Sequence, residues 1–329
     1  MALQSYILRI QRNTPSAQSG ELRTRWQEYP IQAEPNTTVL SLLEEIKGQR
    51  DGTLVYRHSC RSAICGSCAM WISGRTRLAC KTHVGKVADG EGVVEIAPQK
   101  NQPVLKDLAI DIAPFFEQVR AITPYLLDGP ETAVTVTSTA YDQVNHVTQC
   151  ILCGCCYAEC PMVEVSPEFT GPAALAKAFR FVSDPREGFK QERLENLGQP
   201  HALWSCTRCT LCVDVCPKEV APMEAIVKLR SRAVAMGMTD SAAARHALAY
   251  HTDIRRSGQL NEFTLILRTL GVWGSLMESG LAIHLAKKGK IPSPFPHTVA
   301  GVEELRQMYE YLERFPLDVE TKAKEAVPE

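Results

Sequence analysis

The sequence has no surplus of charge of either sign, since 36 lysines and arginines balance 37 aspartates and glutamates over 329 residues. Proteins that bind nucleic acid neutralise phosphates with surplus Lys and Arg, so nucleic acid is not expected as a partner. The N-terminal segment, residues 1–11, alternates apolar and polar side chains and lacks a charged segment followed by an apolar one. No secretory signal is therefore expected.

Long apolar runs and nucleotide-binding motifs are also lacking. The longest apolar stretch, residues 263–285, is interrupted by Arg268, Glu278 and His284, which makes it a poor candidate for a transmembrane helix. No glycine-rich dinucleotide motif lies between an expected strand and an expected helix, so flavin and nicotinamide binding are not expected. None of the eight histidines lies in a recognisable acid–base or ligand motif. We therefore predict no catalytic residue in this chain and assign any substrate chemistry to a partner.

Cysteine is missing from most of the chain, because all thirteen cysteines fall within residues 60–80, 150–160 and 206–216. A disulfide framework would spread the cysteines along the chain, use an even number of them and accompany secretion. Clustered cysteines in a chain without an export signal indicate metal binding instead.

The first group has the spacing Cys60-x4-Cys65-x2-Cys68, followed by Cys80. This is the plant-type spacing of a [2Fe–2S] cluster, in which four thiolates hold two irons. A zinc ribbon is the alternative, but it usually pairs two Cys-x2-Cys units across a longer gap. A Rieske centre is excluded because no histidine lies among the ligands. Gly66 and its small neighbours let the loop wrap closely, so that backbone N–H groups can point at the sulfurs.

The second and third groups share the pattern Cys-x2-Cys-x2-Cys-x3-Cys-Pro, at residues 150–161 and 206–217. In two-cluster bacterial ferredoxins, three cysteines of such a run hold one cubane and the fourth, before proline, ligates the other cluster. The alternative, two structural zinc sites, would not need four cysteines plus proline twice. We assign one [4Fe–4S] cluster to Cys150, Cys153, Cys156 and Cys216. We assign the third cluster, predicted to be [4Fe–4S] with [3Fe–4S] as the alternative, to Cys160, Cys206, Cys209 and Cys212.

These three sets leave one cysteine, Cys155, without a role as a ligand. Its neighbour Cys156 keeps the x2 spacing of the run. We therefore expect Cys155 to pack as a small buried residue.

Secondary-structure signals divide the chain into a β-rich part and a helical part. Alternating or β-branched segments predict strands at residues 6–10, 25–29, 69–72 and 93–96. A helical apolar face at residues 38–47 can be capped by Thr37 or Thr38. Apolar spacing predicts further helices at residues 105–119, 172–182 and 222–236, whereas residues 128–145 are predicted to form a surface loop.

The fold class predicted from these elements is α+β, in three parts. Residues 1–104 are predicted to form a plant-type ferredoxin (β-grasp) domain. Residues 105–238 are predicted to form an all-helical bacterial-type two-cluster ferredoxin domain. Residues 239–329 are predicted to form a helical C-terminal extension with an exposed, charged end at 320–329.

The motifs and their surroundings resemble the iron–sulfur subunit of succinate dehydrogenases and fumarate reductases. The resemblance covers residues 5–235 and rests on four segments: CRSAICGSCAM and LAC within 60–80, LKDL, FEQ and PYL within 105–126, CILCGCC at 150–156, and GPA and RF within 171–181. In that family the subunit connects a FAD-containing flavoprotein, where succinate and fumarate interconvert, to a membrane anchor at which quinone reacts. The resemblance therefore implies these partners, an electron path from flavin through three clusters to quinone, and a cytoplasmic protein held at the inner face of a membrane.

Two departures from the family pattern concern the third cluster. Most members have no cysteine at the position matching Cys209, and their third cluster is [3Fe–4S]. Members also commonly carry tryptophans shortly after the Cys-Pro and a histidine after the first cysteine of the third motif, where this chain has residues 162–165 (MVEV) and Thr207. The pattern resembles an atypical branch whose partner is a cysteine-rich protein instead of a standard anchor, and residues 251–262 resemble tails of heterodisulfide-reductase-type subunits.

Three functions follow from these observations. The first is the electron-transfer subunit of a succinate:quinone or quinol:fumarate oxidoreductase. The second is a subunit of a thiol- or heterodisulfide-linked fumarate reductase. The third is a free-standing multi-cluster electron carrier, although small carriers rarely need three clusters and a helical tail. The polypeptides that co-purify with the chain would distinguish them.

Overall fold

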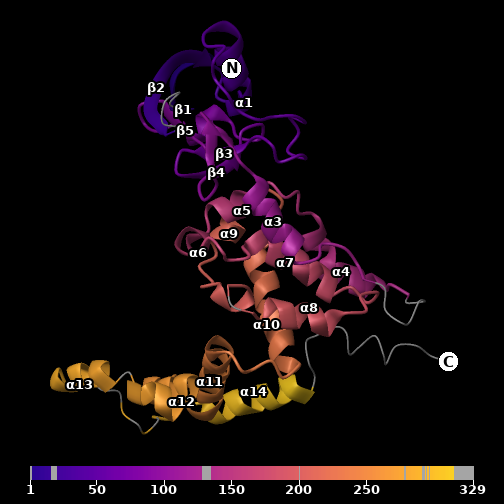
Figure 1. Ribbon diagram of the computed structural model, residues 1–329, viewed down its shortest axis with the longest axis vertical. Coiled ribbons are helices and arrows are strands. Elements are labelled where there is room, and N and C mark those ends of the chain that lie inside the picture. Colours follow the sequence, from indigo (N-terminus) through magenta and orange to yellow (C-terminus); the bar gives the residue numbers. More distant parts are fainter. Residues whose placement is uncertain are drawn as a thin grey trace. The chain divides into compact units, whose positions relative to one another are not determined.

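The computed structural model describes residues 2–15, 21–127, 135–199, 201–277, 279–290, 293, 295 and 297–314 (Figure 1). The chain divides into two compact units. The first unit comprises Met1–Val136 and Tyr141–Leu229 and therefore holds all three cysteine groups. The second comprises Thr137–Ala140 and Arg230–Glu329.

The first unit begins with a mixed five-stranded sheet in the order β2-β1-β5-β3-β4. Its strands are β1 (Gln4–Pro15), β2 (Leu22–Ala33), β3 (Ala69–Ile72), β4 (Arg75–Leu78) and β5 (Val93–Ala97). β1 pairs with β5 in parallel, and the other neighbours pair antiparallel. The four predicted strands are confirmed, and β4 is an additional one.

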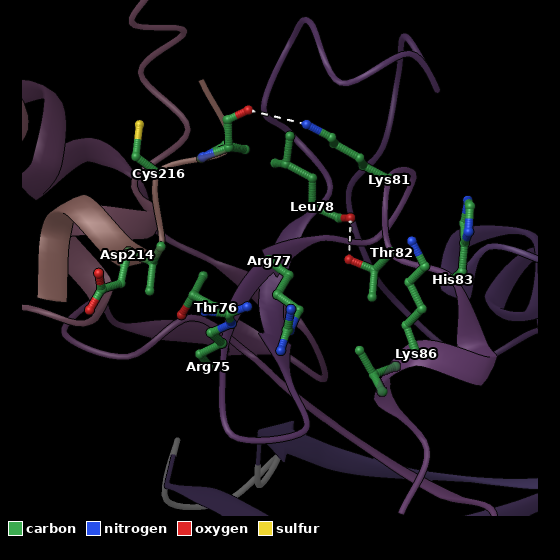
Figure 2. Close-up of a pocket in the computed structure, with 13 residues that line it drawn as sticks. Arg75, Thr76, Arg77, Leu78, Lys81, Thr82, His83, Lys86, Asp214 and Cys216 are labelled. Atoms are coloured by element: carbon green, nitrogen blue, oxygen red, sulfur yellow. Dashed lines mark hydrogen bonds between the residues drawn. The ribbon is translucent and has the colours of Figure 1, made fainter. Parts of the chain in front are cut away.

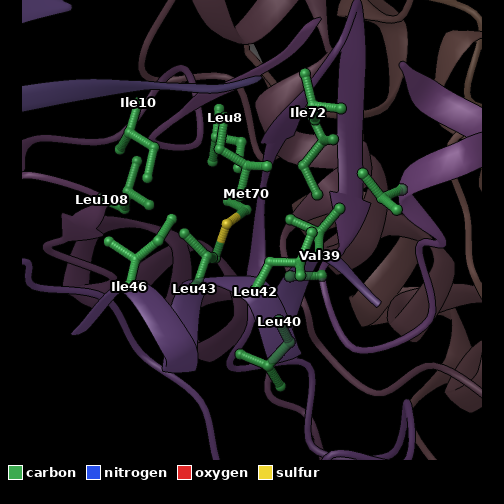
Figure 3. Packing of buried hydrophobic residues seen from close by; sticks show 14 of the residues in the cluster. Leu8, Ile10, Val39, Leu40, Leu42, Leu43, Ile46, Met70, Ile72 and Leu108 are labelled. Atoms are coloured by element: carbon green, nitrogen blue, oxygen red, sulfur yellow. The ribbon is translucent and has the colours of Figure 1, made fainter. Parts of the chain in front are cut away.

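Helix α1 (Val39–Gln49) covers this sheet because its apolar face and alternate residues of the strands bury one another (Figure 3). Thr38 caps the helix, its hydroxyl oxygen accepting the Ser41 N–H at 3.2 Å. Leu8 of β1, Leu43 of α1 and Met70 of β3 lie in this core. One helix on a mixed sheet is the predicted plant-type ferredoxin fold, which is confirmed.

The helix predicted from residue 105 is wrong at its start. Residues 104–110 instead form a small hairpin of β6 (Val104–Lys106) and β7 (Ala109–Ile110), and α3 spans Ala113–Ala121. The turn is held by Asp107, whose φ is 47° and which is completely buried. Its carboxylate pairs with Arg12 at 3.0 Å, and its N–H donates to the Asn13 carbonyl at 2.7 Å. These contacts from a distant strand override the helical apolar spacing.

The rest of the first unit is helical around the cysteine runs, and two of its helices, α4 and α10, include a few residues assigned to the second unit. Besides the short α2 (Val84–Val87), the elements are α4 (Ser138–Thr148), α5 (Cys155–Ala158), α6 (Pro161–Val165), α7 (Pro172–Val182), α8 (Lys190–Leu197), the 3₁₀ helix η1 (Leu203–Ser205), α9 (Leu211–Asp214) and α10 (Pro222–Ala235). The helices predicted at 172–182 and 222–236 are confirmed.

The loop predicted at 128–145 is wrong from residue 138 onward, where α4 begins; residues 128–134 lie outside the described residues. The Thr137 hydroxyl accepts the Ala140 N–H at 3.2 Å and so caps the helix. Val144 and Val147 are buried, which gives this polar segment an apolar face. The Thr- and Ser-rich composition concealed both signals.

The second unit is helical, as predicted for the C-terminal extension. It contains α11 (Ala242–Ser257), α12 (Glu262–Met277), α13 (Ser279–Lys287) and α14 (Val302–Arg314). The Asp253 carboxylate of α11 accepts hydrogen bonds from Arg268 and Thr264 of α12, at 2.7 and 2.8 Å. Gly271 interrupts α12 with φ 72° and ψ 176°, so the apolar stretch 263–285 is not one straight helix. The charged end at 320–329 lies outside the described residues, and no described helix is long and apolar enough to span a membrane.

Candidate metal centres

The first cysteine loop directs backbone N–H groups at sulfur. The Cys60 Sγ accepts N–H groups of Ser62, Ile64 and Cys65 at 3.4, 3.3 and 3.2 Å. Bending of this kind needs positive φ, which occurs at Arg61 (56°), Ala63 (54°) and Gly66 (73°). Hydrogen bonds from Cys65, Ser62 and Ile64 lower the pKa of the Cys60 thiol to about 6. The loop therefore stabilises a thiolate, the form that ligates metal.

The remaining cysteines of the first set complete a compact group. Ala63 donates its N–H to the Cys80 Sγ at 3.3 Å. Burial raises the pKa of the Cys68 thiol to about 12, and the negative charges of the neighbouring Cys80 and Cys65 thiolates raise it as well. Four adjacent sulfurs, some buried and some held by N–H donors, suit a [2Fe–2S] group, whose irons would stabilise the buried thiolate.

The second set surrounds one cavity. Cys150, Cys153, Cys156 and Cys216 line it together with Pro217. The pKa of the Cys156 thiol is raised well above its ordinary value, first by burial and then by the neighbouring thiolates, Cys153 and Cys216 among them. Cys216 is the fourth cysteine of the other run. The structure therefore brings it together with the first three cysteines of this run, as the sequence predicts.

The third set is brought together in the same way. Burial raises the pKa of the Cys160 thiol, and the neighbouring Cys209 and Cys206 thiolates raise it further. Burial likewise raises the pKa of Cys212 to about 12, with Cys206, Cys160 and Cys209 beside it. Cys209 is the exposed member of this set. All four predicted residues therefore lie near one another.

The two cysteine runs have the same backbone turn. Leu152 and Arg208, which each precede the second cysteine, have φ of 52° and 61°. Gly154 and Thr210, which each follow it, have φ of 77° and 68°. Positive φ is unfavourable for a β-branched residue. Thr210 nevertheless adopts it, although it lacks the conformational freedom that glycine has at the matching position 154. Cys209 consequently occupies the same place in its turn as Cys153 in the other.

Among the described residues, no three cysteine, histidine or carboxylate side chains are arranged around a single metal ion. In a mononuclear zinc site all thiolate sulfurs lie about 2.3 Å from one ion. A polynuclear iron–sulfur group holds its ligands further apart, each on a different iron.

Cys155 is completely buried and belongs to the core that also contains Leu108. A hydrogen bond from its thiol to Cys153 lowers the pKa of Cys153. Cys155 is thus the small buried residue expected from the sequence, but it also lines the cavity of the second set, which the sequence did not reveal.

We expect Cys155→Ser to leave the content of iron and acid-labile sulfide unchanged, because Cys156 keeps the ligand spacing. The variant should be less stable by about 1–3 kcal/mol, since a hydroxyl replaces sulfur in an apolar site. Iron, sulfide and thermal unfolding are the measurements, and Cys156→Ser is the matched control that should lose a cubane. Loss of a cubane in Cys155→Ser would show that the register of the run is shifted by one.

The first and second sets are in direct contact. A Cβ atom at Gly66 would lie 2.7 Å from the Cβ of Cys153 and 2.8 Å from its Cα. Real Cβ atoms do not approach so closely, so only glycine lets the first loop rest on the second cysteine run. The sequence had indicated Gly66 as a small loop residue, but not this contact.

Polar side chains that the sequence reasoning missed fasten the sheet to the cysteine runs. Gln99 donates its Nε2–H to the carbonyls of Ala69 and Cys153, both at 3.1 Å. Glu159 accepts the N–H and hydroxyl of Thr76, both at 2.7 Å. Asn101 directs its amide nitrogen at three carbonyls at the end of α5. Only their position after a predicted strand could have drawn attention to Gln99 and Asn101.

Comparisons with known proteins agree with this geometry. Residues 7–117 match the family described as "2Fe-2S iron-sulfur cluster binding domain", and residues 146–220 match "4Fe-4S dicluster domain". Both matches favour iron–sulfur clusters over the zinc alternatives. They do not determine the nature of the third cluster.

Relatives cover most of the chain. The fumarate reductase iron-sulfur subunit of Escherichia coli O6:H1 is 39% identical over 202 residues, covering 60% of this chain and 82% of that protein. The 8-methylmenaquinol:fumarate reductase iron-sulfur subunit of Wolinella succinogenes is 33% identical over 284 residues, covering 82% and 88%. The mitochondrial succinate dehydrogenase [ubiquinone] iron-sulfur subunit 2 of Oryza sativa subsp. japonica is 34% identical, covering 68% and 73%.

A solved structure has the same fold. A chain of the Mycobacterium smegmatis Sdh1 complex in the apo form superposes with a TM-score of 0.65 at 22% identity, covering 71% of this chain and 98% of that one. Sequence, cysteine geometry and fold agree. The chain belongs to the family of electron-transferring iron–sulfur subunits of succinate dehydrogenases and fumarate reductases.

Proposed function

We propose that this chain carries electrons through three clusters, between a FAD-containing flavoprotein where succinate and fumarate interconvert and a membrane or cysteine-rich partner that reacts with quinone. Clusters of these types supply one-electron redox steps at potentials set by ligands, hydrogen bonds and burial. The proposed ligand residues are the three sets of four cysteines described above. This places the protein at the inner face of a membrane through its partners.

The observation that carries the proposal is that consecutive cysteine sets touch. Gly66 of the first loop lies against Cys153 of the second set. Cys156 of the second set has Cys212 of the third among its charged neighbours. Each set therefore has the next one as a neighbour within the first unit, which supports a relay over three independent sites.

The residues of this chain have separate roles in the relay. Backbone N–H groups hold Cys60 as a thiolate at the more exposed end. Cys156, which is almost completely buried, belongs to a cavity with apolar neighbours such as Val220 and Pro222. Burial keeps water from Cys156, whereas the other three cysteines of this set are only partly buried. Hydrogen bonds to sulfur stabilise the more negative, reduced state of a cluster and so raise its potential.

For the third set we propose a [4Fe–4S] cluster with Cys209 as a ligand. The matching turns at Cys153 and Cys209 support this, as does the proximity of Cys209 to Cys160 and Cys212. We further propose that the chain belongs to the branch with a cysteine-rich partner. The residues that support this are Cys209, Thr207 and the MVEV segment at 162–165.

The C-terminal extension is proposed to dock that second partner or the membrane surface. Helix α12 has no buried residue among those described, and Trp273 is 83% exposed. Leu270, Val272 and Leu276 are exposed beside it, and Lys287, Lys288 and Lys290 follow in the sequence. An apolar surface with a basic flank suits a partner or an interfacial position.

Co-purification tests the function and the extension together. The tagged full chain is expected to bring down a stoichiometric flavoprotein and a second partner, whereas the same chain ending at residue 239 should keep the flavoprotein and lose the second partner. Neither form alone should oxidise succinate, because no flavin site is expected in this chain. A stable lone chain would favour the free-standing carrier, and unchanged assembly after truncation would refute the role of the extension.

A milder pair of variants keeps this test independent of folding. Trp273→Glu with Leu276→Glu places two charges on the exposed surface of α12 and should weaken the second partner alone. Ala243→Glu with Ala247→Glu adds the same two charges at exposed positions of α11 and serves as the control for charge itself. Equal loss in both pairs would indicate an electrostatic effect unrelated to docking.

A further inference from the structure

A cleft of about 270 Å³ lies in the first unit between β4, the segment around α2, and the end of α9 (Figure 2). Figure 2 shows Asp214 and Cys216 on one side of it and Lys86 on the other, with Arg75 and Arg77 between them. We call it the basic cleft, because its basic lining residues are Arg75, Arg77, Lys81, His83 and Lys86. Asp214 is the one carboxylate in the lining.

Within the described part of the chain, the basic cleft holds more positive than negative side chains, since Asp214 is its one carboxylate. None of its arginines and lysines forms an ion pair with a described carboxylate. Arg77 donates its Nε–H to the Ile72 carbonyl at 3.4 Å, and Lys81 donates to the Pro217 carbonyl at 3.4 Å. Burial lowers the pKa of Arg77, and the adjacent charge of Arg75 lowers it further. A partly buried guanidinium beside another one is costly unless an anion joins them.

The geometry suits a small anion. Arg75 and Arg77 are two apart on β4, so their side chains leave the same face of the strand. One guanidinium group can bind two oxygens of a phosphate or a carboxylate at once, through two parallel N–H···O bonds. A volume of about 270 Å³ lies just below the roughly 300–1,000 Å³ that drug-sized ligands occupy, as suits a smaller ligand. The other two cavities described are lined by proposed ligand cysteines and therefore belong to the cluster sites.

We propose that the basic cleft binds a small oxyanion with two or more negative charges, carried on phosphate or carboxylate groups. Its arginine pair grips the oxygens, and Lys81 and Lys86 neutralise the remaining charge. The site is distinct from the cysteine sets, although Cys216 lines its edge.

A consequence for electron transfer rests on the proposed function. If Cys216 ligates the second cluster, a bound anion lies next to that cluster and disfavours the arrival of an electron. By linkage, the factor by which the bound anion lowers the equilibrium constant for reduction equals the factor by which reduction weakens anion binding. Each tenfold difference in affinity between the oxidised and the reduced chain shifts the midpoint potential by about 59 mV.

Calorimetry on the anaerobically prepared, cluster-containing full chain tests the binding, with pyrophosphate and citrate as separate probes at low ionic strength. One saturable site is expected, and the double variant Arg75→Gln, Arg77→Gln should bind at least tenfold more weakly. Arg23→Gln with Arg25→Gln is the matched control, because this exposed arginine pair is also two apart on a strand, β2, and removes the same charge. The probe that binds more tightly identifies phosphate or carboxylate as the natural group.

The absence of a saturable site, or equal weakening in both arginine pairs, would overturn the proposal. Iron and sulfide are assayed on the same samples. Full iron content without anion binding would refute anion binding at the basic cleft and leave the cluster assignment intact. Anion binding without iron would refute the cluster assignment and leave the anion site intact. A redox titration of the second cluster should show a lower midpoint with the probe in the wild type and in the control pair, and no shift in the Arg75, Arg77 variant.

Discussion

Gly66→Ala is expected to push apart the first and second cysteine sets and to slow electron passage between them. The new Cβ would meet Cys153 at 2.7 Å, and the atoms it meets are a Cα and a Cβ, which cannot rotate away. Either the loop or the second run must shift. Because Cys65 and Cys68 flank Gly66 and Cys153 is a proposed ligand, a shift on either side changes the spacing of two clusters.

The effect on stability can be separated from ordinary backbone strain. Gly66 has φ +73°, and an alanine there is strained whatever the space around it. Gly74→Ala is the matched control, since Gly74 has φ +95° and nothing within 4 Å of its added Cβ. Gly66→Ala should therefore be the less stable variant by about 1–3 kcal/mol, the cost of overpacking.

Thermal unfolding and rapid reduction measure the two consequences. After mixing with a strong reductant, the second cluster should fill with electrons more slowly in Gly66→Ala than in the wild type, while Gly74→Ala keeps the wild-type rate. Equal rates and equal stabilities in the two alanine variants would mean that the contact with Cys153 has no role in the relay.

The sequence predicted local structure wherever a short pattern decides it. Strand β1 follows from alternation alone, since Leu8 and Ile10 are completely buried on one face. Helix α1 follows from its apolar face and from Thr38 as its cap. The hairpin of β6 and β7 was missed because its apolar residues also fit a helical spacing. The contact that decides between the two, Asp107 with Arg12, joins residues far apart in the sequence.

The cysteine sets were predictable for a different reason. A cluster imposes its ligand spacing on the chain, so four cysteines at set distances define a site before any fold is known. Contacts between the sets carry no such signal. Gly66 reads the same in any tight loop, and nothing in the sequence connects Gln99 with the Cys153 carbonyl. The basic cleft was hidden likewise, because β4 was not predicted and its two arginines resemble a solvated strand face.

Cys209→Ala is expected to convert the third cluster into a three-iron form, with the loss of one iron per chain. A cubane loses its fourth iron when no thiolate is available at that corner. The φ values beside Cys209, 61° and 68°, repeat the positive φ values beside Cys153, so Cys209 holds the same place in its turn as a proposed ligand of the second set. An added thiolate also brings negative charge, which favours the oxidised form and lowers the potential relative to a three-iron cluster. Such a site suits a low-potential partner more than a quinone of high potential.

Paramagnetic resonance of anaerobically prepared protein decides the matter. An oxidised [3Fe–4S] cluster is paramagnetic, whereas an oxidised low-potential [4Fe–4S] cluster is silent. We expect silence in the wild type and a full oxidised signal in Cys209→Ala. Cys155→Ala removes a neighbouring thiol that is not a proposed ligand and should stay silent. Anaerobic handling matters because Cys209 is exposed, so oxidation can strip the iron that it holds. A full-stoichiometry oxidised signal in the wild type, unchanged in Cys209→Ala, would show that Cys209 is free and the third cluster has three irons.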